Sequence, residues 1–284
     1  MTGELPTPPR GVLHPAVAPG RFEHRQRAPA PDLAPWIEHH WFVAWDLSGL
    51  PDRVQETLPH PNLHLVVENG EAALWGIQRR RFTKTLSGRG WVYGLKFRVA
   101  AFHAFHRQPV SDLSDRHVAA CDVLGEAAQA LIEPESAGDL ERLSLRAEAL
   151  LRSLAPGVAE PRAERIAAIV RRIADDPAIT SVDALCRVVG ESVRQLQRDF
   201  HRYVGVPPKW VIARYRLHEA VALIQSGAAQ PDAELAQRLG YFDQAHFIRD
   251  FRRIVGCTPR DYARSLENAA ATLHRSQPWS PAGR

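Results

Sequence analysis

Two stretches of the chain place arginine and glutamine side chains along a short amphipathic segment. They share a phrase, which reads RDFHRYVGVPP at residues 198–208 and RDFRRIVGCTP at residues 249–259. Guanidinium and amide groups present forked donors and acceptors that match the edges of guanine and adenine in the major groove of DNA. Apolar residues recur at helical spacing on the other side of each segment, which predicts two helices with polar outer faces. The chemistry that this pattern favours is hydrogen bonding to a duplex.

Each predicted helix has an apolar inner face and a polar outer face. In the first copy Val193, Leu196 and Phe200 are predicted to face inward, and in the second copy Phe247 and Phe251 are the inward anchors. A polar outer face is by itself explained by solvation alone. Its occurrence twice, with Arg and Gln in place of Glu and Lys, favours DNA as the partner. The predicted outward residues are Arg194, Gln195, Gln197, Arg198 and His201, then Gln244, Ala245, His246, Arg249, Arg252 and Arg253.

The elements around each copy predict a helix-turn-helix. VDALCRVVG (182–190) and SVRQLQRDFHRYVG (192–205) form a short helix, a glycine turn and a second helix, which opens on a capping box of Ser192 and Gln195. AELAQRLG (233–240) and DQAHFIRDFRRIVG (243–256) repeat that outline. The predicted helix between them, 208–226, would span about 27 Å at 1.5 Å per residue. Adjacent major grooves lie about 34 Å apart, so one chain can reach two of them.

Charge and composition fit a nucleic-acid partner in a reducing compartment. Residues 161–264 hold 17 Lys+Arg against 12 Asp+Glu, whereas the remainder holds 19 against 20. No apolar run reaches membrane-spanning length, and the N-terminus lacks the features of a secretion signal. The three cysteines are scattered, which argues against disulfides and zinc fingers. We therefore expect a cytoplasmic protein with no membrane association, no metal and no cofactor.

The chain is predicted to have an α+β fold in two domains. Residues 1–31 contain seven prolines and are expected to be a disordered leader. Residues 32–155 are expected to form an effector-sensing or dimerisation domain, with a mostly antiparallel sheet or open barrel followed by helices. Residues 156–161 are the expected linker, 162–265 an all-α DNA-binding domain and 266–284 a tail. The strands are expected in 36–47, 62–68, 71–77 and 91–97.

The N-terminal half concentrates histidine and tryptophan. Nine of the 13 histidines lie within the first 120 residues. His60, His64 and Glu68 share one face of a predicted strand, which leaves metal coordination open beside the simpler expectation of hydrogen-bonding or packing side chains. The tryptophans are expected to be core residues, yet a small barrel this rich in aromatics is a natural site for an apolar or aromatic effector. The residues proposed for that pocket are Trp41, His64, Trp75 and Trp91.

Residues 162–265 resemble the DNA-binding domain of the AraC/XylS family of bacterial transcription regulators. The resemblance is carried by LAQRLGYFDQAHFIRDFRRIVGCTPRDYAR (235–264) and by SVRQLQRDFHRYVGVPPKWVIARYRLHEA (192–220). It implies base contacts by Arg194, Gln197 and Arg198 and by Gln244, Ala245 and Arg249. Ala245 cannot donate a hydrogen bond and Ile248 replaces Gln197 of the first copy, so the second helix is expected to read thymine methyls or to hold the backbone. Arg202, Arg252 and Arg253 are the phosphate candidates.

Residues 36–118 resemble a companion domain found at the front of other such regulators. The resemblance is carried by LPHPNLHLVVENG (58–70) and LSGRGWVYGLKF (86–97), with Val99-Ala100-Ala101 where the pattern has a Pro-Gly segment. The leucine stripe at 140–154 fits either a dimer seam or packing against the sheet. The expected partners are promoter DNA, an unknown small effector, RNA polymerase and a second copy of the chain. The alternatives are a metal-dependent enzyme domain localised to DNA, and a nucleoid protein without sequence preference.

Overall fold

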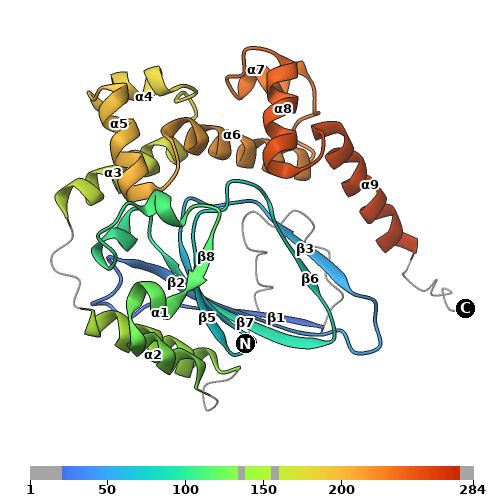
Figure 1. Cartoon of the computed structure of the whole chain (residues 1–284). Coiled ribbons are helices and arrows are strands. Elements are labelled where there is room, and N and C mark those ends of the chain that lie inside the picture. The colour runs from blue at the N-terminus through green and yellow to red at the C-terminus, as the bar shows by residue number, and fades with distance from the viewer. Residues whose placement is uncertain (1–20, 134–137, 155–159, 276–284) are drawn as a thin grey trace, which may run out of the picture.

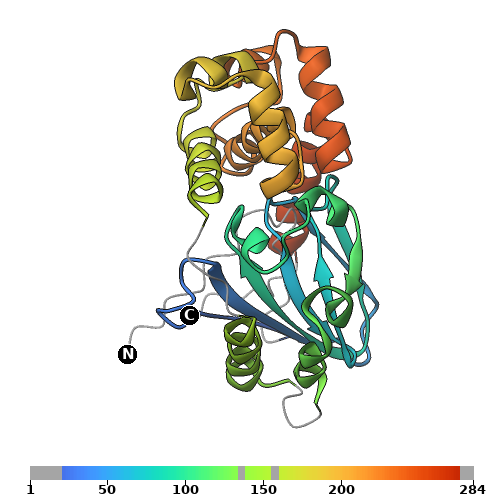
Figure 2. The ribbon, with the colours of Figure 1, turned by 60° about the vertical axis from the view of Figure 1, so that its left-hand side comes forward.

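The computed structural model describes residues 21–133, 138–154 and 160–275. An antiparallel sheet domain is followed by a domain of helices that lies across one end of it (Figures 1 and 2). This agrees with the predicted order of an α+β domain and an all-α domain. The predicted linker lies outside the described residues except for its last two, and Pro161 already begins a helix.

Six strands form the main sheet in the order β1-β2-β7-β4-β5-β8, and every neighbouring pair is antiparallel. The sheet is open, so the barrel-like description holds only loosely. Two further strands, β3 and β6, form a separate two-stranded antiparallel sheet. The strands are β1 (Phe22–Arg27), β2 (Ile37–Asp46), β3 (Arg53–Thr57), β4 (His64–Glu68), β5 (Glu71–Trp75), β6 (Phe82–Leu86), β7 (Arg89–Phe97) and β8 (His117–Ala119).

The two faces of the main sheet follow the two-residue period of a strand. On β7, Tyr93, Leu95 and Phe97 are fully buried in the core, whereas Val92 and Lys96 line a cavity on the other face. Trp41 and Trp45 of β2 stand on the cavity face directly opposite Gly94 and Gly90. A Cβ at either glycine would lie within 2.3 Å of the indole ring. Glycine is therefore required beneath each tryptophan.

Helix α2 (Leu140–Ser153) covers the core face of the sheet. Its apolar stripe, Leu140, Leu143, Ala147, Leu150 and Leu151, is buried in the main hydrophobic cluster. The stripe therefore packs inside the domain, and the alternative of a dimer seam built from it is wrong. The short helix α1 (Ala120–Leu124) follows β8. Short 3₁₀ turns lie at Ala101–Ala104, Val110–Leu113 and Glu126–Ile132 in the described part of this domain. Ala100 adopts φ 65°, the left-handed conformation that the expected glycine would suit.

The predicted disordered leader is wrong for residues 22–27, which form β1 along the edge of the sheet. The segment is held by Glu148 of α2, whose side chain is 2% exposed. Glu148 accepts hydrogen bonds from the Arg27 side chain at 3.2 Å and from the Ala30 backbone at 2.9 Å. Because this partner lies 118 or more positions away, local composition could not reveal it. The part of the predicted leader before residue 21 lies outside the described residues.

The C-terminal domain is helical, as predicted. One helix differs from expectation: α9 continues past residue 265, so the predicted tail is wrong for residues 266–275. The remainder of that tail lies outside the described residues. The helices are α3 (Pro161–Asp175), α4 (Val182–Val189), α5 (Val193–Asp199) with a π-helical turn (Phe200–Val204), α6 (Pro208–Gln225), α7 (Ala233–Arg238), α8 (Gln244–Val255) and α9 (Pro259–Arg275).

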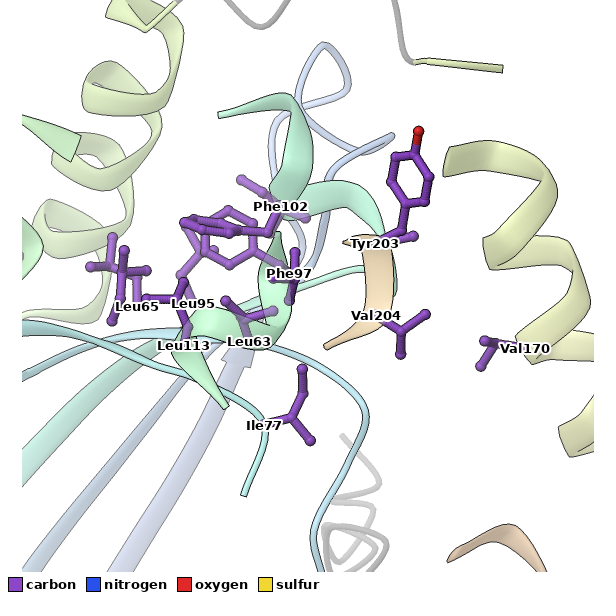
Figure 3. Close-up of a cluster of buried hydrophobic side chains, with 14 of the residues drawn as sticks. Leu63, Leu65, Ile77, Leu95, Phe97, Phe102, Leu113, Val170, Tyr203 and Val204 are labelled. Carbon is purple, nitrogen blue, oxygen red and sulfur yellow. The ribbon is translucent and has the colours of Figure 1, made fainter. Parts of the chain in front are cut away.

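The hydrophobic core runs without a break from the sheet into the first helix-turn-helix. Leu63, Leu95 and Phe97 of the sheet domain belong to the same cluster as Val170 of α3 and Val204 of the π-helical turn. Figure 3 shows these side chains in one view. The second helix-turn-helix has a core of its own, built around Phe247, Phe251 and Leu217, into which the sheet domain contributes Leu58. The N-terminal domain thus touches both halves of the helical domain.

Candidate nucleic-acid interface

The first helix-turn-helix consists of α4, a glycine turn and α5. Gly190 ends α4 in the left-handed conformation at φ 71°. Ser192 caps α5 by accepting a hydrogen bond of 3.2 Å from the backbone N–H of Gln195, which confirms one half of the predicted capping box. The Gln195 side chain donates to Asp199 at 2.6 Å. The turn thereby presents the first residues of α5 to solvent.

A network of charged side chains fixes α5 to α3. Arg162 of α3 donates to both Glu191 in the turn and Asp199 of α5. Arg165 also donates to Glu191, at 2.6 Å. Burial raises the pKa of Glu191, but the bonds from Arg162 and Arg165 outweigh it and leave that pKa lowered. The bonds to Glu191 and Asp199 raise the pKa of Arg162. This network orients the helix whose outer face carries Arg194, Gln197 and Arg198.

Those three predicted base-contact side chains are all exposed along α5. Arg198 donates to Gln195, which is half-buried. The prediction that Val193 faces inward is wrong: it is 38% exposed, because it occupies the first turn of the helix beyond the core contacts of Leu196. Arg202, a phosphate candidate, is exposed and donates to His103 of the sheet domain at 3.2 Å. The base and phosphate assignments of these residues stay predictions.

The second helix-turn-helix repeats this plan with α7 and α8. Asp232 caps α7, and Asp243 caps α8 by accepting a hydrogen bond of 2.6 Å from the N–H of His246. Gly240 turns the chain between the helices at φ 77°. Gln244, Ala245, Arg249, Arg252 and Arg253 are exposed, and Arg253 bonds Asp250 at 3.0 Å.

Phe242, in the turn before α8, is 95% exposed and was not singled out from the sequence. In the sequence, Phe242 cannot be distinguished from its aromatic neighbour Tyr241, and Tyr241 does pack against the second hydrophobic cluster. Their neighbouring positions in a turn send the two rings in different directions. Phe242 therefore extends the exposed surface at the start of α8, next to Gln244 and Ala245.

The two outer faces stand at opposite ends of α6, as Figure 1 shows for α5 and α8. The 18 residues of α6 correspond to about 27 Å of helix. Eleven of those residues are buried, since α6 packs against both helix-turn-helix units and the sheet domain. It is therefore a rigid spacer for the two exposed faces.

Side-chain bonds join the sheet domain to the helical domain. Ser114 donates to the carbonyl oxygen of Gly205 at 2.7 Å, and Trp210 donates to that of Arg79 at 3.2 Å. Arg214 of α6 donates to the carbonyl oxygen of Pro59 at 2.9 Å. These contacts fall on the first helix-turn-helix and on the spacer helix.

A cavity of about 1940 Å³ lies between the sheet and these helices. Three of the four residues predicted for an effector pocket line it: Trp41, His64 and Trp75. Trp41 donates from Nε1 to Nδ1 of His64 at 3.2 Å, and Trp75 stacks on His117. The assignment of Trp91 is wrong. Trp91 lies two residues from Tyr93 on β7, so its side chain is on the core face of the sheet. There it stacks on Phe42, with ring centroids 6.0 Å apart.

The histidines of the N-terminal half are spread over both faces of the sheet. Burial lowers the pKa of His64 to about 3, so its ring is neutral at physiological pH. His40, on the core face, bonds Tyr93 and Glu148 instead. Within residues 21–133, 138–154 and 160–275, no three His, Cys, Asp or Glu side chains are grouped so that they could hold a metal ion. None of the helices in the described part of the chain combines the length and apolar character that crossing a bilayer needs.

Comparison with known proteins divides the chain as the structure does. Residues 185–265 match a family described as a helix-turn-helix domain, and residues 25–119 match a domain of unknown function, DUF6597. The F1 operon positive regulatory protein of Yersinia pestis is 37% identical over 82 residues, which are 29% of this chain and 27% of that protein. The HTH-type transcriptional regulator GbdR of Pseudomonas aeruginosa is 29% identical over 105 residues, or 37% and 28% of the two chains. The chain thus matches less than a third of the length of these relatives.

A solved structure, that of an apo ToxT variant from Vibrio cholerae, aligns over 87% of this chain and 98% of its own, with a TM-score of 0.37 and 13% identity. The family match over residues 185–265 and the regulators that the chain resembles there agree with the resemblance of residues 162–265 to the AraC/XylS regulators. The C-terminal part of the chain is a helix-turn-helix domain of the AraC type, preceded by a DUF6597 domain.

Proposed function

We propose that the chain is a sequence-specific DNA-binding transcription regulator that places α5 and α8 in adjacent major grooves. The observation that carries the proposal is the exposure of Arg194, Gln197 and Arg198 at one end of α6 and of Gln244 and Arg249 at the other. These side-chain types read guanine and adenine edges. The names of the relatives, which are transcription regulators, support the same function.

Binding to the DNA upstream of its own gene tests the proposal. Fluorescence anisotropy of purified protein should give a tighter complex with that fragment than with shuffled DNA of the same composition, and the affinity should fall as salt rises. Replacing Arg194, Gln197 and Arg198 by alanine should remove the preference. Arg142→Ala, an exposed arginine on α2, is the matched control and should leave it intact. Equal affinity for both DNAs would instead make the protein a nucleoid binder.

The enzyme alternative is tested on the same preparation. Elemental analysis should find no stoichiometric metal, and the purified protein should not turn over small-molecule substrates. Bound metal accompanied by turnover would favour a catalytic N-terminal domain that the helix-turn-helix domain localises to DNA.

We further propose that a small effector binds in the cavity and modulates DNA binding from there. The support is the lining of the site: Trp41, His64 and Trp75 supply aromatic walls on the sheet side, and α3 and α6 of the DNA-binding domain line the opposite side. A regulator of this kind acts on promoter DNA in the bacterial cytoplasm. Contact with RNA polymerase and formation of a homodimer stay predictions, and a dimer would use a surface other than the buried stripe of α2.

A further inference from the structure

The cavity is shared by the two domains. The sheet domain lines it with residues of β2, β4 and β6, and α6 lines it with Arg214, Tyr215, His218, Ala222 and Gln225. At about 1940 Å³ it is larger than the usual small-molecule site of about 300–1,000 Å³. A ligand in it can therefore touch the spacer helix and the sheet at once, and a polar anchor is needed to define its position.

Arg214 is a buried cation, and no carboxylate in the described part of the chain forms an ion pair with it. Four lysines and arginines line the cavity away from solvent, and three of them are paired: Lys84 with Glu68, Lys96 with Glu38 and Arg216 with Glu219. Arg214, which is 3% exposed, is the fourth. Among the described residues its bonds go only to neutral groups, from Nε to the Pro59 carbonyl and from Nη2 to Nδ1 of His60 at 2.5 Å. Its guanidinium also lies 4.4 Å from the centroid of the Tyr215 ring.

The charges of Tyr215 and Glu38 favour the protonated form of Arg214, but burial outweighs them, and the Glu38 carboxylate forms its ion pair with Lys96. Burial, reinforced by the charge of Arg214, lowers the pKa of His60 and of His218 well below the ordinary value, so both rings are neutral. Burial lowers the pKa of Arg214 itself to about 10, which still leaves it protonated at physiological pH. An uncompensated buried charge costs several kcal/mol, so an anion that pairs with it is strongly favoured. This end of the cavity is built for one negative group.

The remaining walls determine what the anion is attached to. Trp41, Trp75 and Phe82 present aromatic surface, and Trp75 and Phe82 meet edge to face with centroids 5.5 Å apart. Val66 and Leu58 add aliphatic surface. Among singly charged anions, a carboxylate suits a guanidinium well, because its two oxygens match the planar fork of N–H donors on the arginine.

We propose that the cavity binds a small organic carboxylic acid as its anion, with the carboxylate on Arg214 and an aromatic or aliphatic body against Trp41 and Trp75. The inference rests on the proposed function, since it names the chemical class of the effector. Because Arg214 belongs to α6, the bound acid bridges the sheet domain and the helix that spaces the two recognition helices. Binding then stabilises the docked arrangement of the two domains. A ligand held by the sheet alone would not contact α6 and would not have this effect.

The test compares acids with their neutral amides. Phenylacetate, indole-3-acetate and decanoate are titrated by calorimetry into the full chain without DNA, each beside phenylacetamide, indole-3-acetamide or decanamide. At least one acid is expected to bind about tenfold or more tightly than its amide, because a charge-assisted bond contributes about 1.5–3 kcal/mol. That acid should also raise the midpoint of thermal unfolding. Failure of every acid to bind at millimolar concentration, or equal affinity of acids and amides, overturns the proposal.

Variants assign the anchor. Arg214→Gln should abolish the difference between acid and amide, and Arg214→Lys should keep most of it, which preserves the test if the glutamine variant does not fold. Arg171→Gln removes an exposed cation from the rim of the same cavity and should change nothing. An unchanged preference in a folded Arg214→Gln protein overturns the assignment. A separate measurement of promoter binding distinguishes this proposal from the proposed function. If the protein prefers its promoter but binds none of the acids, it is still a sequence-specific regulator, and only the carboxylic-acid effector is ruled out.

Discussion

A Cβ placed on Gly240 would lie 2.1 Å from Cγ2 of Thr180. The turn of the second helix-turn-helix therefore lies directly against the segment that precedes α4 of the first. This contact is independent of α6 and gives the two recognition helices a second constraint on their separation. Any side chain at position 240 must push the two units apart or distort the turn.

Gly240→Ala should accordingly destabilise the protein and weaken promoter binding. The left-handed backbone at φ 77° costs alanine about 1–2 kcal/mol, and the overlap with Thr180 adds about 1–3 kcal/mol. Gly49→Ala is the matched control, because Gly49 has φ 76° with nothing within 4 Å of the added Cβ. Urea unfolding of both variants separates the two costs. Equal losses of free energy would show that the contact with Thr180 has no energetic weight.

A base contact is predicted for Arg198 and a phosphate contact for Arg252, and the loss of each should affect a different property of DNA binding. Arg198→Ala should cost about 1–3 kcal/mol on the promoter and relax the choice at one base position. Arg252→Ala should weaken binding to every sequence and reduce the slope of affinity against salt by about one ion. Both side chains are exposed, so folding should be unaffected. Anisotropy against a library of single-base variants at several salt concentrations gives both readings, and a uniform loss for Arg198→Ala would make it a phosphate contact.

The Arg162 network predicts a stability that depends on pH. Arg162→Ala leaves Glu191 and Asp199 buried without their shared partner, which should cost about 2 kcal/mol after allowance for the partial exposure of Arg162. Because the folded pKa of Glu191 lies below its unfolded value of 4.5, the stabilisation is complete above that pH and is lost as pH falls through the folded pKa. The difference between wild type and variant should therefore be full at neutral pH and shrink in acid.

Arg172→Ala serves as the control for that measurement, because Arg172 also lies on α3 but pairs with Asp176 at the surface. Its effect should stay below about 0.5 kcal/mol at neutral pH. Urea titrations at neutral and acidic pH give the free energies of unfolding. A constant difference across that range would exclude the carboxylates as its source.

The helical half of the molecule was predictable because its signals are local. Apolar spacing, the Ser192 cap and the glycine turns each act within one or two helical turns, and the predicted helices match the observed ones closely. The edge strand β1 was missed because Arg27 and Ala30 bond Glu148 far along the chain. Trp91 was misplaced because both faces of β7 carry apolar residues, so composition does not identify the cavity face. Trp91 lies on the same face of β7 as Tyr93, two residues along the strand. That this face is the core face becomes clear only from the structure, in which Tyr93 is buried.

The anchor at Arg214 could not be foreseen for a related reason. In the sequence, Arg214 and Arg216 are two arginines of the same helix. Only the fold shows that Arg216 pairs with the carboxylate of Glu219, whereas Arg214 donates to a backbone carbonyl oxygen. The cavity itself is assembled from two domains, so no contiguous stretch describes it.

Two apolar side chains at the start of α8 are candidates for contacting thymine. Ala245 and Phe242 are three positions apart and both exposed at the start of α8, where they form the apolar part of a surface that otherwise carries Gln244 and Arg249. Such groups contact the C5-methyl group of thymine. Replacing each thymine of the second half-site in turn by deoxyuridine, which lacks only that methyl, should weaken binding at one or two positions by about 1 kcal/mol. Phe242→Ala or Ala245→Gly should remove the penalty at the position that each side chain contacts, while Arg249→Ala should leave it unchanged. If deoxyuridine is tolerated everywhere, or if its penalty survives in both variants, α8 holds the backbone and does not read thymine.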